Sequence, residues 1–430
     1  MVWLFAKRPV AVVRLGYRGG TLGRIRALQD YQRSVRPKTT WHRCGSFVGN
    51  TWGDRNRDAR IGEAFIVKEI EAGARLGVDV IQIDDGWQAG MMANAAGAQA
   101  TRSGLWSGYW DSDAGFWDVH PERFPNGFDP IIKVARENGV EIGLWFSPDS
   151  AGDFANWERD VARILELHRR YGVRFFKMDG IRCESAFGLE RLRRLFDSVL
   201  HASNGEVIFD LDITAQTRPG YWGMISGGPL FVENRYTDWH GYWPHHTLRN
   251  LWKLARWVDP LRLRFELLNN ERNRYRYPDD PLAPETYAAE TLFAMVMISN
   301  PLGWFECSSL PETYYQALPE LVALWKRRRV AWTDLTILPV GEEPDGWSIS
   351  GFLLVDPEDR LAEALFFRGA GARENERVEL PAGVPRPGDA SLLAGNGFVS
   401  SGDRCIDVSL PEKHSFAWLE FPDGRRSYGT

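Results

Sequence analysis

The 430-residue chain is long enough for one large domain with a smaller one beside it. Its 44% hydrophobic and 25% charged residues are ordinary for a soluble globular protein, and its net charge of −5 gives no sign of a nucleic-acid or anionic-membrane partner. The chain also contains 19 tryptophans, and tryptophan together with aspartate, glutamate and arginine is typical of carbohydrate sites.

Neither the cysteines nor the N-terminus carries a processing or metal-binding pattern. The first twenty residues hold only short apolar runs broken by basic side chains, so no signal peptide is expected. No segment has the length of apolar sequence that crosses a bilayer, and a cytoplasmic location is the default expectation. Free thiols without a structural zinc site are predicted, because no CxxC pattern joins the four widely spaced cysteines: Cys44, Cys183, Cys307 and Cys405.

In chain order, residues 1–40 predict a short strand region and a helix, GTLGRIRALQDYQRSVR, that leads into the next domain. From about residue 41, short apolar segments alternate with helical patterns, as expected of a parallel α/β fold. The predicted strands are 44–50, 78–84, 140–146, 173–179, 206–212, 229–234, 261–267 and 298–305. The predicted helices are 61–76, 129–138, 154–171, 187–200, 246–257, 285–296 and 313–328.

Eight strands with helices between them favour a (β/α)8 barrel over residues 41–334, rather than an open doubly wound sheet. No glycine-rich phosphate loop follows the first strand, so a dinucleotide is not expected and no cofactor is predicted. The long loop 86–128 is rich in aromatic residues, which favours a wall of the binding cleft over disorder. Short alternating segments over 335–430, separated by glycine and proline, predict a C-terminal antiparallel β-sandwich.

Polar side chains gather at the ends of the predicted strands, where a barrel of this type places its active site. Two adjacent carboxylates in IDDGWQ are costly unless a donor-rich ligand hydrogen-bonds to them, and a sugar faced by an aromatic ring meets that need. The strand-end residues are Asp54, Asp84, Asp85, Trp145, Lys177, Asp179, Asp212, Glu233, Asp238 and Glu266.

Asp179, in VRFFKMDG, is the strongest nucleophile candidate. Strand alternation places Lys177 on the same face, and a neighbouring ammonium keeps a carboxylate ionised. A structural ion pair is the alternative reading of the same two residues.

The partner acid is expected after the sixth strand, in GPLFVENRYTDWHGYWPHH. A retaining glycosidase needs two carboxyl groups about 5–5.5 Å apart, one of them shielded so that its pKa rises. Asp238, beside Trp239, suits the acid, and Glu233 is the rival. The nearby histidines predict a helix start rather than a metal site, because no carboxylate ladder joins them.

The motifs IDDGWQ, GLWFSP, FFKMDG and NRYTDWHGYW resemble clan D glycoside hydrolases, specifically the α-galactosidases (melibiases) of glycoside hydrolase family 36, over roughly residues 20–335. The resemblance implies a (β/α)8 barrel with a C-terminal β-sandwich, hydrolysis with retention, and a carbohydrate partner. It also leaves a homo-oligomer open.

The resemblance assigns roles residue by residue. The aspartate of the KxD motif, Asp179, would be the nucleophile, and Asp238 would be the acid/base. The paired aspartates would hold the sugar's O4 and O6, and Lys177 the neighbouring hydroxyls. These paired aspartates are Asp84 and Asp85. Trp52 and Trp145 would line the pocket, and Arg218 and Arg235 would contact the O2 side or the acid/base. If Glu233 is not the acid, we expect it to be a hydroxyl-binding or supporting carboxylate.

Two departures from the family pattern bear on these roles. Arg235 lies three residues before Asp238 where the clan commonly has four, which keeps Glu233 open as the acid. The family's large N-terminal β-domain is represented only by its connecting helix, which leaves substrate range and assembly open. The alternatives are a transglycosylase, a hydrolase of another α-glycoside, a non-catalytic carbohydrate-binding barrel and a metal-dependent barrel hydrolase.

Overall fold

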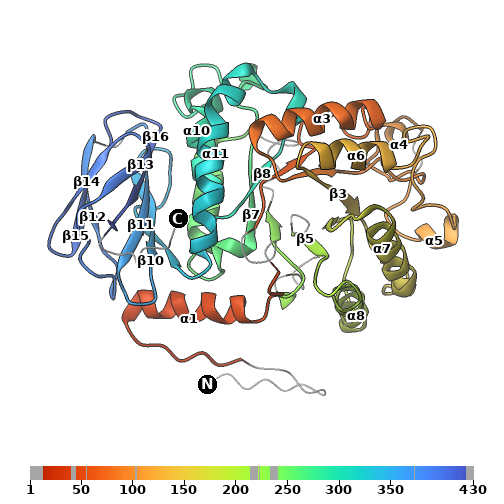
Figure 1. The fold of residues 1–430 in the computed structure, drawn as a ribbon, viewed down its shortest axis with the longest axis horizontal. Helices are drawn as coiled ribbons and strands as arrows, with labels where there is room; N and C mark the ends of the chain where they lie inside the picture. Colours follow the sequence, from red (N-terminus) through yellow and green to blue (C-terminus); the bar gives the residue numbers. More distant parts are fainter. Residues whose placement is uncertain are drawn as a thin grey trace.

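The computed structural model describes residues 13–39, 45–54, 56–101, 104–213, 221, 223–232, 241–371 and 373–422. Eight parallel strands form a closed barrel in which β1 pairs with both β2 and β8 (Figure 1). The strands are β1 Val48–Asn50, β2 Val80–Ile83, β3 Glu141–Phe146, β4 Phe175–Met178, β5 Ile208–Asp212, β6 Leu230–Val232, β7 Leu263–Leu267 and β8 Asn300–Gly303. The predicted barrel is therefore confirmed.

Helices cover the barrel, and within the described residues they connect every pair of successive strands except β5 and β6. Glycine explains where some of them stop: Gly77 ends α3 with a φ of 81°, a conformation that a side chain rarely adopts. A proline begins α9, where the missing N–H costs nothing. The described α-helices of this part are α3 Glu63–Leu76, α4 Ala96–Thr101, α5 Tyr109–Ser112, α6 Asp129–Glu137, α7 Trp157–Tyr171, α8 Ala186–Ala202, α9 Pro244–Leu254, α10 Ala289–Val296 and α11 Glu312–Trp332.

After the barrel, two antiparallel sheets form the predicted β-sandwich. The five-stranded sheet has the order β13-β16-β11-β10-β9, and the three-stranded sheet has the order β12-β15-β14. Their strands are β9 Thr336–Gly341, β10 Ile349–Val355, β11 Leu361–Arg368, β12 Asn375–Glu379, β13 Ser391–Gly395, β14 Phe398–Ser401, β15 Cys405–Ser409 and β16 Ser415–Glu420. The domain boundaries at 40 and 334 stay predictions.

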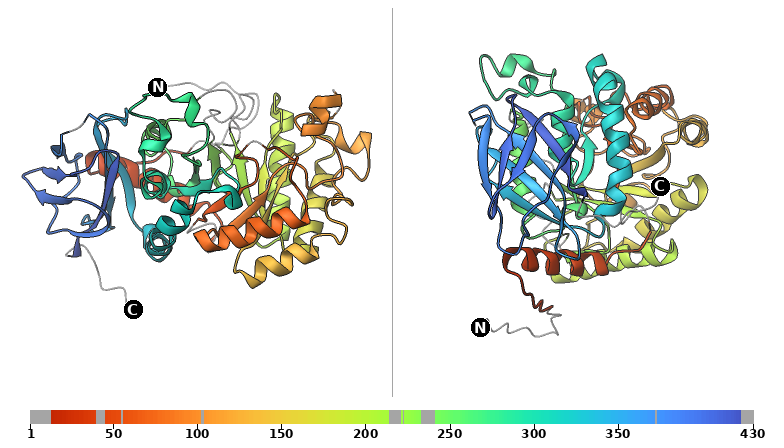
Figure 2. Two further views of the ribbon diagram at one scale, coloured as in Figure 1. Left: turned by 90° about the horizontal axis from the view of Figure 1, so that it is seen from above. Right: turned by 60° about the vertical axis from the view of Figure 1, so that its left-hand side comes forward.

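The sandwich lies beside the barrel, against α10 and α11, in both views of Figure 2. The buried carboxylate of Glu363 joins the two parts, because it accepts hydrogen bonds from the indole N–H groups of Trp332 in α11 and Trp418 in β16. Arg328 of α11 also pairs with Glu420 of β16. One hydrophobic cluster includes residues of both the barrel and the five-stranded sheet.

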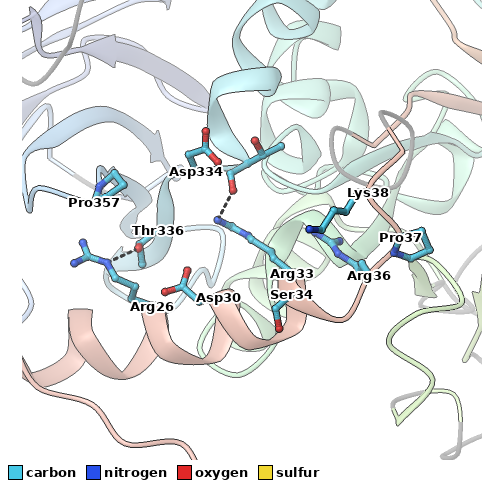
Figure 3. A pocket seen from close by; sticks show the side chains of 11 residues that line it. Arg26, Asp30, Arg33, Ser34, Arg36, Pro37, Lys38, Asp334, Thr336 and Pro357 are labelled. Atoms are coloured by element: carbon cyan, nitrogen blue, oxygen red, sulfur yellow. Dashed lines mark hydrogen bonds between the residues drawn. The ribbon is translucent and has the colours of Figure 1, made fainter.

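Helix α1 (Gly20–Ser34) runs along one side of both parts (Figure 1). Leu22 and Ile25 pack into the sandwich core, and Arg33 pairs with the buried Asp259 beyond α9. A cavity of about 560 Å³ lies between α1 and the start of β9, and Figure 3 shows its basic lining. Arg26 and Arg33 there already bind carboxylates and main-chain carbonyls, which indicates a structural role.

Two smaller predictions can also be compared with the structure. Cys307 and Cys405 are buried free thiols and Cys183 is a partly exposed one, as expected; Cys44 lies outside the described residues. The strand region expected in residues 1–12 also lies outside them. No helix within the described ranges is both long and apolar enough to cross a membrane.

Candidate active site

Lys177 lies at the centre of a cluster of charged side chains inside the barrel. Its ammonium is 2.9 Å from Asp84, 3.6 Å from Asp179 and 3.7 Å from Asp212. Strand alternation explains the arrangement, because inward-facing positions two residues apart at the ends of β2, β4 and β5 face the same interior. Burial disfavours the ammonium, but the three carboxylates outweigh it and raise the pKa of Lys177 above its usual value.

Asp84 is held rigidly against Lys177. Its Oδ2 accepts hydrogen bonds from the lysine Nζ and from Asn50 Nδ2, at 2.9 and 2.8 Å. Its Oδ1 accepts a hydrogen bond from the backbone N–H of Asp85, and its own N–H donates to Thr51 Oγ1. A buried carboxylate with this many donors is stabilised in its position.

A chain of hydrogen bonds runs from Asp84 into the barrel interior. Asn50 Nδ2 also donates to Gln82 Oε1, and Gln82 Nε2 donates to Asp210 Oδ2. Arg264 closes the chain by donating to Asp210 Oδ1 at 2.7 Å. Every residue of this hydrogen-bond chain is buried. The chain therefore holds the side chain of Asp84, and through it Lys177, in one position.

The sequence predicts Asp84 and Asp85 as a pair, but their carboxylates have different partners. Asp85 Oδ1 accepts a hydrogen bond from Gln88 Nε2 at 2.6 Å, and its buried Oδ2 has no hydrogen-bond partner within the described ranges. Burial, with Asp58 and Asp84 nearby, raises the pKa of Asp85 to about 8. This raised pKa favours the protonated form of Asp85 at neutral pH.

Asp179 has the geometry of a positioned and accessible carboxylate. Trp145 Nε1 donates to its Oδ2 at 3.1 Å, and the backbone N–H of Gly180 donates to its Oδ1 at 2.6 Å. Its side chain is 23% exposed, whereas those of Lys177 and Asp84 are 3% and 4% exposed. Asp179 is thus the most exposed of the three carboxylates around Lys177, and its neighbours hold it in place.

Aromatic rings complete the surroundings of the ammonium. Lys177 Nζ lies 4.8 Å from the ring centroid of Phe231 and 5.0 Å from that of Trp304, distances at which a cation is attracted to a ring face. Trp52 belongs to the same buried apolar cluster inside the barrel. Polar groups surrounded by rings are the environment that a sugar requires, with hydroxyls to bind and an apolar face to cover.

The long loop after β2 folds across the ends of β3 and β4. Arg123 anchors its base by donating to Gly86 O and pairing with Asp58. The rings of Trp87 and Trp117 pack on β3, where Trp87 Nε1 donates to the main-chain carbonyl of Trp145. The loop is therefore an ordered wall beside Asp179.

Some predicted strand-end residues lie outside this cluster. Asp54 pairs with Arg272 and accepts a hydrogen bond from the backbone N–H of Glu306, and Glu266 accepts one from Thr247 Oγ1. His245 is buried near His246, and this burial lowers its pKa to about 4. The described residues contain no group of three or more histidine, cysteine, aspartate or glutamate side chains that could hold a metal ion.

Four predicted site residues lie outside the described residues: Arg218, Glu233, Arg235 and Asp238. Sequence reasoning missed Asn50 and Trp304, and it named Asp212 only as one of the strand-end residues. Asn50 ends the first strand immediately before TW, so a polar residue at that strand end is the signal that could have identified it. Trp304 follows β8 at the same edge of the barrel.

The fold and the strand-end cluster define a (β/α)8 barrel whose candidate site lies at the C-terminal ends of the strands. No family model matches the chain. Among curated proteins, it is 28% identical over 102 residues to α-galactosidase 2 of Pediococcus pentosaceus, which is 24% of this chain and 12% of that protein. It is 30% identical over 90 residues to α-galactosidase AgaA of Geobacillus stearothermophilus, which is 20% of this chain and 10% of that protein.

Solved structures give a longer match. A complex of an AgaA variant, a glycoside hydrolase family 36 α-galactosidase, with 1-deoxygalactonojirimycin has a TM-score of 0.67 at 17% identity, over 94% of this chain and 59% of that one. The α-galactosidase of Lactobacillus brevis has a TM-score of 0.65 at 12% identity, over 96% of this chain and 60% of that one. The predicted resemblance to family 36 α-galactosidases is confirmed, and this chain spans about three fifths of these two structures.

Proposed function

We propose that the chain is a retaining glycoside hydrolase that removes terminal α-D-galactosyl units through a covalent glycosyl-enzyme intermediate. The observation that carries the proposal is the arrangement around Lys177, where one accessible carboxylate, Asp179, is fixed by Trp145 and Gly180 beside a buried ammonium. An ammonium 3.6 Å away favours the ionised form that attack on carbon requires.

In the proposed reaction, an Asp179 oxygen attacks the anomeric carbon while the bond to the leaving oxygen breaks. The acid, assigned to Asp238 by resemblance, gives its proton to that oxygen. In the second step the same residue removes a proton from water, whose oxygen displaces Asp179 from the same carbon. Two inversions give net retention.

Galactose is the proposed sugar because of the carboxyl groups that follow β2. Asp84, fixed by Asn50 and Lys177, can accept a hydrogen bond from a sugar hydroxyl, whereas a protonated Asp85 can donate one. The named relatives are α-galactosidases, and the AgaA complexes with raffinose and stachyose show those sugars bound to that protein. Lys177, Trp52 and Trp145 are proposed as the remaining described contacts.

A panel of nitrophenyl α-glycosides, assayed on the purified protein with and without a chelator, tests this proposal. We expect turnover of the α-galactoside that does not change with the chelator, because the proposed chemistry uses two carboxyl groups. Turnover of an α-glucoside or α-N-acetylgalactosaminide without the α-galactoside would contradict the choice of sugar. Products formed mainly by transfer to added sugars rather than to water would instead indicate a transglycosylase.

A further inference from the structure

A cavity on the β-sandwich lies where the edges of its two sheets meet. It measures about 470 Å³ and is lined by the end of β9, the start of β10 and most of β12. β9 and β12 are edge strands of their sheets and lie close together, but no hydrogen-bonded pairing joins them within the described residues. Sheet edges of this kind keep main-chain donors and acceptors for other partners, so the cavity suits a polar ligand.

Trp347 lines this cavity and is 45% exposed, on a turn whose backbone is fixed. Asp345 Oδ1 accepts hydrogen bonds from the backbone N–H groups of Trp347 and Ser348, at 2.8 Å each. The backbone N–H of Ala370 donates to Gly346 O, also at 2.8 Å, which ties the turn to the chain after β11. The backbone that carries the exposed indole is therefore held in place without a ligand.

Glycines support one side of the indole. A Cβ at Gly371 would lie 2.9 Å from Trp347 Cε3 and 3.4 Å from its Cβ, so a side chain there would press on the ring. A Cβ at Gly369 would lie 2.5 Å from the main-chain carbonyl carbon of Trp347. Because neither position carries a side chain, Trp347 lies directly against the segment between β11 and β12, and its remaining surface is exposed.

The polar lining of the cavity has more carboxylates than cations. Within the described residues, no hydrogen bond or salt bridge uses the carboxylates of Glu342, Glu376 and Glu379. Arg377, the cation among the lining residues, is already bound to Asp407 at 2.8 Å. This balance disfavours a phosphate or a uronate, and the described residues hold no group of side chains that could bind a metal ion. The lining therefore fits a neutral ligand that is rich in hydroxyl donors.

The turn that carries Trp347 packs on the side of the barrel at which the barrel strands end. A Cβ at Gly346 would lie 2.9 Å from Leu282 Cδ1, in the loop after β7, and 3.0 Å from His245 Nδ1, in the first turn of α9. In a barrel of this type, the loops and helix starts that follow the strands surround the active-site face. The turn therefore lies on the same side of the molecule as the candidate active site.

We propose that this cavity is a second carbohydrate site, which binds a pyranose unit of a neutral polysaccharide and takes no part in bond cleavage. The exposed indole of Trp347 covers the apolar face of the sugar ring, and the carboxylates of Glu342, Glu376 and Glu379 accept hydrogen bonds from its hydroxyls. The site goes beyond the proposed function, because it binds a glycan whichever bond the barrel cleaves. Its role is to hold a polymer against the sandwich.

Affinity electrophoresis through gels that contain a polysaccharide tests the proposal. The neutral probes are β-1,4-galactan, β-1,4-mannan and dextran, none of which is built on α-galactosyl bonds that the barrel could cleave, and polygalacturonate is the acidic comparison. At least one neutral probe should retard the protein, and Trp347→Ala should raise the Kd for that probe about tenfold. Trp347→Phe should recover part of the affinity, and Glu376→Gln should weaken binding by a smaller factor.

Trp257→Ala is the matched control, because Trp257 is also exposed, at 63%, but lies after α9 and outside the cavity. It should leave the Kd unchanged, and Trp347→Ala should hydrolyse a nitrophenyl α-galactoside at the rate of the unaltered protein.

The second site would be overturned if no neutral probe retarded the protein, if polygalacturonate retarded it more strongly, or if Trp347→Ala and the unaltered protein were retarded equally. A dimer in size-exclusion chromatography that Trp347→Ala dissociates would also overturn it, because a second copy of the chain would then cover the indole. Absence of α-galactoside turnover by the unaltered protein would remove the proposed function alone, since the retardation is measured without any cleavage.

Discussion

At the scale of single residues, the site depends on the different distances from one buried ammonium, that of Lys177, to three carboxylates. Asp84 receives the short contact and is fixed by further donors, whereas Asp179 and Asp212 lie 3.6 and 3.7 Å from Lys177. Asp179 is held by an indole N–H and a backbone N–H, and it is also the most exposed of the three carboxylates. This difference supports the proposal that Asp84 binds the substrate and Asp179 attacks it.

The acid can be identified by its dependence on the leaving group. Protonation matters most for a poor leaving group, so Asp238→Ala should damage hydrolysis of a disaccharide far more than that of a dinitrophenyl galactoside. The ratio of the two kcat/KM values measures the effect, and azide should accelerate the second step in this variant. If the same split appears in Glu233→Ala and not in Asp238→Ala, the two roles must be exchanged.

Asp85 should make stability depend on pH. Its pKa is about 8 in the folded protein and 3.8 for the unperturbed side chain, so between these values the unfolded chain releases a proton that the folded protein keeps. The stabilisation of the folded protein by this retained proton is fully present below pH 3.8. It decreases by about 1.4 kcal/mol per pH unit as the pH rises towards 8. Asp85→Asn has no carboxyl group at this position, so its stability should not show this decrease with pH.

Urea unfolding of both proteins at pH 4.5, 6 and 7.5 measures the difference. The stability of Asp85→Asn relative to the unaltered protein should rise steadily across this series. Parallel pH profiles for the two proteins would show that the burial of Asp85 does not hold its proton.

At the scale of elements, the loop after β2 owes its order to a few buried acceptors. Asp149 accepts hydrogen bonds from the backbone N–H groups of Gly108 and Ala151. Asp149→Ala should leave both donors without their acceptor and loosen residues 104–112, at a local cost of about 1–3 kcal/mol. Hydrogen exchange followed by mass spectrometry should show faster exchange in that segment.

Asp113→Ala is the control within the same loop, because Asp113 accepts a hydrogen bond from Gly115 N at an exposed position. Asp113→Ala should speed hydrogen exchange only in the turn that contains Asp113 and Gly115. Equal exchange of residues 104–112 in the unaltered protein and in Asp149→Ala would mean that the loop is held by its aromatic packing alone.

Element prediction succeeded where local pattern decides structure. The apolar runs gave all eight barrel strands, because strands covered by helices are apolar throughout, as VIQI in β2 nearly is. Boundaries shifted where turns intervene: the helix predicted at 285–296 begins at Ala289, after a short 3-10 turn at Pro284–Thr286. The prediction that Lys177 and Asp179 lie close together is confirmed, because Lys177 lies in β4 and Asp179 directly follows its end.

The rest of the site depends on contacts between distant segments, which no local pattern encodes. Asn50 meets Asp84 only when β1 and β2 pair in their observed register. Adjacent Asp84 and Asp85 looked equivalent in the sequence, yet the chain turns directly after β2, so Asp84 meets Lys177 while Asp85 meets Gln88. The rings of Phe231 and Trp304 approach Lys177 only because the barrel closes.

At the scale of the whole molecule, the half-buried Arg33 of α1 links the barrel to the start of the sandwich. Arg33 pairs with Asp259, whose side chain is fully buried, and it also donates to the carbonyls of Thr333 and Leu335 between α11 and β9. Arg33→Ala should therefore destabilise the folded protein by about 3 kcal/mol, since it leaves part of a buried charge uncompensated. Denaturant unfolding measures the loss.

Arg24→Ala is the control on the same helix. Arg24 donates to Arg256 O at the surface and lies over the ring of Trp257, so its removal should cost under about 1 kcal/mol. Equal losses in the two variants would show that α1 is held mainly by Leu22 and Ile25 rather than by its buried ion pair.

The central claim is that Asp179 forms a covalent bond to the sugar, and trapping this intermediate tests it most directly. A fluorinated galactosyl fluoride that reacts faster than its adduct hydrolyses should label the protein once, and peptide mass spectrometry should place the label on Asp179. Asp179→Asn, which keeps a nearly isosteric side chain, should fold normally, take up no label and lose activity by about 10³-fold or more. A label on another residue, or Asp179→Asn retaining more than a few per cent of the original rate, would contradict the account.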